Sequence, residues 1–167
     1  MHLVKSSLVR LCGVAAALFL FGCGSSSSSG DPAAAFAGNW TFGSGSLQPM
    51  CGGLGSTLTP VDLTGDTMTI VRVDPTHVST SLTGSGVMCN VNFTVSGMIA
   101  TAETAGSTCA VTVPVGTSST TVAISITSWT LNVSGDTLSM SMSGSANATI
   151  FTCTPTADGN ATRPPAG

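Results

Sequence analysis

The chain has 167 residues, of which 42% are hydrophobic, 5% aromatic and 7% charged, and its formal net charge is −3. Only four residues are lysine or arginine, and from residue 23 onward Arg72 and Arg163 are the only two. So few cations cannot neutralise a row of phosphates, and nucleic acid is therefore excluded as an expected partner.

The first 22 residues have the organisation of a secretory signal peptide. Basic Lys5 and Arg10 precede an apolar run of about 11 residues that ends at the small residue Gly22. A helix that spans a bilayer needs about 20 apolar residues, so the run predicts a cleaved signal rather than a membrane anchor. Residues 1–22 are therefore left out of the fold prediction.

The predicted cleavage point reads Leu20-Phe21-Gly22-Cys23. This stretch resembles the lipobox of bacterial lipoproteins, although Phe21 replaces the small residue usual at its position. In that family the cysteine becomes the first residue of the mature protein and carries acyl chains such as palmitate. The resemblance implies that Cys23 is lipidated and anchored in the cell envelope, and Gly24 in place of an aspartate favours the outer over the inner membrane. An ordinary cleaved signal with an incidental thiol is the alternative.

Residues 23–35 read as the lipidated cysteine and a flexible tether, "GSSSSSGDPAAA". A Gly/Ser-rich tether of about 12 residues has an end-to-end distance of roughly 20 Å. Residues 36–156 are long enough for a single domain with its own core. The polar, Pro-containing residues 157–167 are expected to form a disordered tail.

Four further cysteines follow the tether: Cys51, Cys89, Cys109 and Cys153. An even number in an exported chain predicts two disulfides, for which three connectivities exist. We expect Cys89 to pair with Cys109, which closes a hairpin, and Cys51 with Cys153, which ties the first strand region to the last. A metal site is disfavoured, because no two cysteines have C-x-x-C spacing and His77 is the only histidine after the signal.

The domain alternates apolar residues with Ser, Thr or Asn, as half-buried strands do. The stretch "CNVNFTV" at 89–95 is one example, and the phase of the alternation changes near Thr127 and Ser128, where a β-bulge is expected. The two-residue turn signals in "VSGM" and "SGDT" predict hairpins at 95–98 and 134–137. The expected strands are about 39–44, 57–64, 67–73, 77–83, 88–95, 98–102 with 109–113, 120–133 and 137–151.

These patterns predict an all-β fold, an antiparallel barrel or sandwich of about eight strands, stapled by two disulfides. Gly38-Asn39-Trp40 is similar to the G-x-W sequence that opens the first strand of lipocalins and avidins. That resemblance implies that Trp40 plugs one end of a barrel, and it carries no ligand with it. A tryptophan that anchors the first strand of any β-domain is the alternative interpretation.

His77 in "DPTH" could act as a general base oriented by Asp74, with a serine as nucleophile. The same four residues also fit a turn, and the G-x-S-x-G motif of serine hydrolases is missing from the sequence. Asp62, Asp66 and Asp74 could hold calcium, but they do not form a D-x-D-x-D-G loop. We therefore expect no catalytic residue, metal site or cofactor.

The sequence favours a non-catalytic envelope lipoprotein, a structural or interaction module whose partner protein is not identified. The alternative is a lipocalin-like carrier that encloses a small apolar ligand. A packed interior would favour the module, and an apolar cavity of several hundred Å³ would favour the carrier. Flexible methionines could line such a cavity, namely Met68, Met88, Met98, Met140 and Met142.

Overall fold

The computed structural model describes residues 30–52, 59–105, 107–115, 118–148 and 151–164. The predicted signal peptide, Cys23 and most of the tether therefore lie outside the described residues. The elements are η1 (Pro32–Ala35), β1 (Gly38–Gly52), β2 (Val61–Asp62), β3 (Thr67–Asp74), β4 (His77–Gly84), β5 (Val87–Ser96), β6 (Ile99–Ala102), β7 (Thr108–Val115), β8 (Ser118–Ser134), β9 (Thr137–Ala148) and β10 (Phe151–Thr162).

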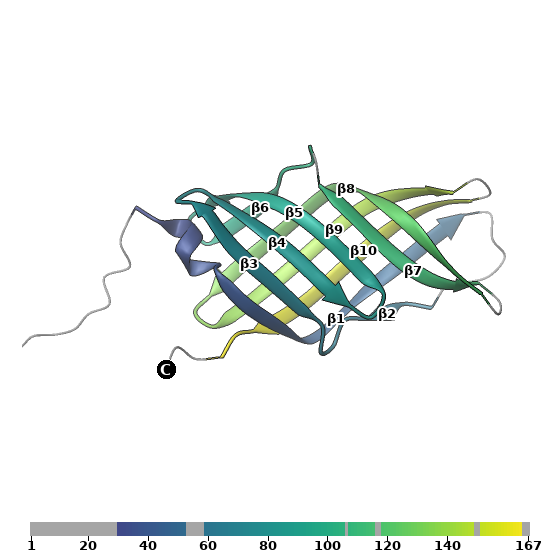
Figure 1. Ribbon diagram of the computed structural model, residues 1–167, viewed down its shortest axis with the longest axis horizontal. Coiled ribbons are helices and arrows are strands. Elements are labelled where there is room, and N and C mark those ends of the chain that lie inside the picture. Colours follow the sequence, from purple (N-terminus) through teal and green to yellow (C-terminus); the bar gives the residue numbers. More distant parts are fainter. Residues whose placement is uncertain (1–29, 53–58, 106, 116–117, 149–150, 165–167) are drawn as a thin grey trace, which may run out of the picture.

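The strands form one closed antiparallel barrel (Figure 1). Their order is β10-β9-β8-β6-β5-β4-β3-β1, and β1 also pairs with β10, which closes the sheet. The short strands β6 and β7 both lie between β5 and β8 and together occupy one position, so the barrel has eight strands. The predicted all-β class is confirmed, and the barrel is the correct one of the two predicted architectures.

Inward and outward residues alternate along each strand. In β5 every second residue is buried, from Val87 to Val95, and the residues between them are exposed. The inward positions are apolar because burying a polar group costs free energy unless it is hydrogen-bonded. The outward positions of β8, β9 and β10 are mostly Ser, Thr and Asn, which hydrate the surface without charge.

Aromatic side chains fill the barrel interior near η1. Trp40, Phe42, Phe93 and Trp129 are at most 1% exposed, and Phe36 from the segment after η1 is fully buried. The rings of Phe93 and Trp129 meet edge to face, with centroids 5.6 Å apart and an interplanar angle of 78°. This geometry is the favourable one for two aromatic quadrupoles.

Two glycines let bulky residues approach the opposite strand. A Cβ at Gly159 in β10 would lie 2.9 Å from the Phe42 ring, and a Cβ at Gly144 in β9 would lie 2.7 Å from Ile124. Real Cβ atoms essentially never show contacts this short, so a larger residue at either place would force its neighbours to shift. Phe42 and Ile124 therefore fill space that the two glycines leave free.

Both predicted disulfides are confirmed. Cys51–Cys153 joins β1 to β10, and Cys89–Cys109 joins β5 to β7. In each case the two cysteines are directly paired across neighbouring strands. The first disulfide links the two strands that close the barrel. The second links β5 to β7, near the point where β7 replaces β6 beside β5.

The predicted bulge and hairpin turns are also confirmed. The β8–β9 register shifts between Ile126 and Ser128, next to the expected change of phase. The β5–β6 and β8–β9 hairpins turn at Gly97-Met98 and Gly135-Asp136, where both glycines have positive φ. Glycine reaches this conformation without the steric cost that a side chain would add.

Several expected boundaries are wrong. The strand expected at 39–44 continues to Gly52, and the one expected at 57–64 is a strand only at Val61–Asp62 in its described part. The stretch expected as one strand, 137–151, contains β9 and the first residue of β10. Tether residues 32–35 form η1, whose cap is Asp31.

The largest error is the tail expected at 157–167, because β10 continues through Thr162 and pairs on both sides with β1 and β9. The polar residues and prolines of this stretch are typical of a loop. Pro155 cannot donate a backbone hydrogen bond, and the β9–β10 pairing skips Thr154 and Pro155. Pro155 therefore lies where the pairing of β10 with β9 is interrupted.

Candidate functional site

Trp40 lies at the end of the barrel that η1 covers. Its side chain is fully buried, and Nε1 donates a 2.8 Å hydrogen bond to the carbonyl of Phe36, just after η1. The backbone N–H of Ala33 in η1 donates to the carbonyl of Pro75 in the β3–β4 turn. The first strand, the helix and this turn are therefore linked around the Trp40 indole.

Arg163, which directly follows the last strand β10, contacts the same end of the barrel. Its guanidinium lies 4.7 Å from the centre of the Trp40 ring, and Nη1 donates to the carbonyls of Ala35 and Ala37 at 3.1 and 3.3 Å. Nη2 donates to the carbonyl of Gly135 at 3.2 Å, and Nε pairs with Asp136 at 3.1 Å. Figure 1 shows η1 and the end of β10 at the same end of the barrel.

Sequence reasoning missed Arg163 because it placed this residue in a disordered tail. A signal was present in "TADGNAT" at 156–162, where the small residues Ala157, Gly159 and Ala161 recur at every second position. All three face the interior and are buried. Small residues at every second position therefore also indicate a strand, provided that a bulky side chain from a neighbouring strand fills the space beside them.

His77 lies between two carboxylates on the outer face. Its Nδ1 is 2.8 Å from Asp74 Oδ2, and its Nε2 is 3.6 Å from Glu103 Oε1. Thr94 on β5 donates a 3.0 Å hydrogen bond to the same Glu103 oxygen. The ring therefore connects the β3–β4 turn to the segment that follows β6.

Asp74 forms the turn that the "DPTH" sequence predicts. It accepts hydrogen bonds from the backbone N–H of Thr76 at 2.7 Å and from the Thr76 hydroxyl at 3.0 Å. The backbone bond from Thr76 and the contact with His77 lower the pKa of Asp74 from 3.8 to about 2. Among the described residues no serine is hydrogen-bonded to His77, and the hydroxyl beside the ring is that of Thr76, 3.1 Å from Nδ1.

The acidic residues considered for calcium have separate roles. Asp62 accepts a 2.9 Å hydrogen bond from the Thr64 backbone, which lowers its pKa. Asp66 is buried and accepts a hydrogen bond from Ser85, and its Oδ2 has no partner within the described ranges. Within the described ranges no three His, Cys, Asp or Glu residues are grouped so that they could hold a metal ion.

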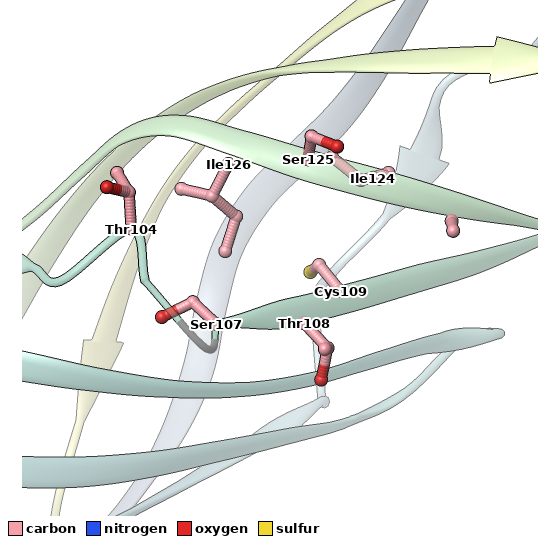
Figure 2. Close-up of a pocket in the computed structure, with 8 residues that line it drawn as sticks. Thr104, Ser107, Thr108, Cys109, Ile124, Ser125 and Ile126 are labelled. Carbon is pink, nitrogen blue, oxygen red and sulfur yellow. The ribbon is translucent and has the colours of Figure 1, made fainter.

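A hollow of about 260 Å³ opens in the barrel wall between β8 and the segment that joins β6 to β7. Figure 2 shows Thr104 and Ser107 on one side and Ile124, Ser125 and Ile126 on the β8 side. The remaining lining residues are Thr108, Cys109 and Ala123. The hollow therefore combines hydroxyl groups with an apolar surface.

The change from β6 to β7 creates this hollow. The β7–β8 pairing ends at Cys109 and Ile124, and the β6–β8 pairing begins at Thr101 and Thr130. Among the described strands, residues 125–129 of β8 therefore have no partner on this side. The segment after β6 turns away towards β5 instead, because the backbone N–H of Glu103 donates to the carbonyl of Asn92.

Trp129 is the inward residue that follows Ile126 along β8, beyond the bulge. The indole is 1% exposed, and its Nε1 has no hydrogen-bond partner among the described residues. A buried donor without a partner is unusual, because its desolvation costs about 1–3 kcal/mol. This donor lies one inward position along β8 from Ile126, which lines the hollow.

The methionines divide between the two faces of the barrel. Met68, Met140 and Met142 are buried, as expected of residues that could line a cavity. Met88 and Met98 instead face outward and are 65% and 49% exposed, so the expectation that they line the interior is wrong.

No model of a known protein family matches the chain, and no curated protein sequence or solved structure matches it. In the part of the chain that the structure describes, none of the helical structure is long and apolar enough to cross a bilayer.

Proposed function

We propose that this protein is a lipid-anchored lipoprotein of the bacterial cell envelope whose barrel is a non-catalytic structural or interaction module. The observation that carries the proposal is the pairing of the cysteines. All four cysteines of the barrel form disulfides with one another, so Cys23 has no partner left among them. Two disulfides are typical of an oxidising compartment outside the cytoplasm.

Lipidation accounts for Cys23, which has no disulfide partner among the barrel cysteines. Each buried methylene contributes about 0.8 kcal/mol, and two or three acyl chains together hold a protein stably in a bilayer. The outer membrane is the proposed destination, because Gly24 follows Cys23. The non-catalytic role is supported by His77, whose two ring nitrogens both face carboxylates.

Substitution of Cys23 tests the anchor. In cells that express the full chain, Cys23→Ser should move the protein from the membrane to the soluble fraction and abolish incorporation of a labelled fatty acid. Cys12→Ser is the matched control, because Cys12 lies in the apolar part of the signal, and it should change neither readout. A Cys23→Ser protein that remains labelled and membrane-bound would overturn the proposal.

The hollow supports a second candidate function, the binding of a small ligand. The lining combines the hydroxyl-bearing residues Thr104 and Ser107 with the apolar residues Ile124 and Ile126, a combination that suits a neutral amphiphile. A volume of about 260 Å³ limits the ligand to a small molecule. Access from the side of the barrel does not require the end that η1 covers to open.

Calorimetry with decanol tests this candidate. Ser125→Phe places a ring at the hollow and should abolish binding. Ser141→Phe makes the same change at an exposed outward position of β9 and should leave binding intact. Absence of decanol binding to the unmodified protein, or equal loss in both variants, would rule out the hollow as the site.

A further inference from the structure

Exposed apolar side chains are concentrated at the η1 end of the barrel. Six large hydrophobic residues of the described chain are exposed, and four of them lie near this end. Val71 and Val73 precede the β3–β4 turn, and Met98 and Ile99 form the β5–β6 turn and the start of β6. We call these four residues the apolar rim.

The two turns that carry the apolar rim are adjacent. The backbone N–H of Val95, near the end of β5, donates to the carbonyl of Thr76 in the β3–β4 turn at 2.7 Å. The carbonyl of Pro75 in that turn accepts from Ala33 of η1. The helix and both turns therefore form one end of the molecule, the left end in Figure 1.

The chain reaches Cys23 from this same end. Gly30 is the first described residue and lies two positions before η1, so only seven residue steps separate it from Cys23. A fully extended segment of that length spans about 25 Å, and a flexible one has an r.m.s. length of roughly 15 Å. An anchor at Cys23 would hold the apolar rim within this distance of the lipid.

We infer that the apolar rim contacts the headgroup region of the bilayer, so that the barrel stands on the membrane with its η1 end down. This inference rests on the lipid anchor proposed above. Exposed apolar residues lose contact with water when they enter the interfacial region, and this transfer is favourable. The opposite end, with Met50 and the disulfide Cys51–Cys153, would then point away from the membrane.

Charges at the η1 end favour apolar contact over recognition of phosphate. Arg72 is paired with Asp31 at 2.7 Å, and Arg163 is paired with Asp136 at 3.1 Å. Both arginines of the mature chain are therefore already neutralised by carboxylates. The contact should form on zwitterionic lipid and should change little with salt concentration.

Tryptophan reporters at two exposed methionines test the orientation. Met98→Trp places the reporter on the apolar rim, and Met88→Trp is the matched control at a similarly exposed position near the other end of β5. Met88 and Ser96 are eight residue steps apart along β5, a distance of about 27 Å, and Ser96 lies two residues before Met98. The unmodified chain supplies the background from Trp40 and Trp129.

The chain from Cys23 to Gly167 is coupled through the Cys23 thiol to a maleimide lipid in phosphatidylcholine vesicles. This coupling supplies the anchor whether or not the cell acylates Cys23. A lipid that carries a nitroxide at its headgroup should then quench the added emission of Met98→Trp more than about twofold. It should hardly quench that of Met88→Trp, because a nitroxide quenches over a distance much shorter than the separation of the two reporters along β5.

Equal quenching of the two reporters, stronger quenching of Met88→Trp, or no quenching of either would overturn the orientation. Failure of the proposed anchor would instead appear in the Cys23→Ser fractionation, which does not depend on how the barrel is oriented. Ile99→Asp combined with Met98→Trp provides a second check, because a charge on the apolar rim should weaken the quenching while the barrel stays coupled.

Discussion

The guanidinium of Arg163 lies 4.7 Å from the centre of the Trp40 ring and joins the end of the last strand to the beginning of the first. It also donates hydrogen bonds to the backbone carbonyls of Ala35 and Ala37, which precede β1, and of Gly135 in the β8–β9 turn. One side chain thus satisfies three carbonyls that no strand pairing reaches.

Arg163→Ala should destabilise the barrel by about 2–4 kcal/mol. The estimate combines a cation–π contact with hydrogen bonds from a charged donor, and the Arg163 side chain is 26% exposed. Arg72→Ala is the control, because the Arg72 side chain is 41% exposed and its surface ion pair with Asp31 contributes about 1 kcal/mol or less. Urea unfolding followed by tryptophan emission measures both, and equal losses would contradict the role of Arg163.

Gly159→Ala should destabilise the protein by about 1–3 kcal/mol, since its Cβ would lie 2.9 Å from the Phe42 ring. Gly43→Ala is the matched control on β1, where a Cβ would meet nothing within 4 Å, and it should be close to neutral. Phe42→Leu should recover part of the loss in the double variant, because the two residues compete for one space. If the losses of the two single variants simply add in the double variant, residues 42 and 159 do not compete for the same space.

Loss of the two disulfides should have unequal effects. Cys51–Cys153 closes a loop with a sequence separation of 102 residues and Cys89–Cys109 one of 20 residues. Loop-closure entropy predicts losses of about 5 and 3 kcal/mol for the corresponding paired Cys→Ala variants. Denaturant unfolding of both variants compares them directly, and a larger loss without Cys89–Cys109 would show that local packing outweighs loop length.

The strands whose sequence alternates were predictable, because alternation maps directly onto a sheet with one buried face. The stretch "CNVNFTV" predicted β5, and "TLSMSMS" predicted the start of β9. In β10 the neighbouring strands accommodate Pro155 and Gly159, two residue types that often interrupt strands. Pro155 lies where the pairing with β9 is interrupted, and Gly159 gives space to Phe42 from β1. The contact of Gly159 with Phe42 joins residues more than 100 positions apart, which local patterns do not contain.

The candidate sites show the same limit. The turn at Asp74 and His77 was visible because its residues are neighbours in sequence, whereas the contact of His77 with Glu103 depends on strand pairing. The hollow was not predictable either. Its lining residue Ile126 lies on β8, and only the break between β6 and β7 leaves that part of β8 without a partner.

Asp74 should make stability depend on pH in the acid range. Its pKa in the folded protein is about 2, below its ordinary value of 3.8. A lowered pKa means that the unfolded chain binds the proton first, so the stabilisation is complete above about pH 4 and is lost as the pH falls towards 2. In Asp74→Asn the amide oxygen can still accept from Thr76 N–H, so this variant isolates the charge. The difference in free energy of unfolding between the two proteins should therefore shrink from pH 4 to pH 2. A carbon-13 titration of the Asp74 carboxyl should show the low midpoint directly, and a difference that stays constant over this range would refute the assignment.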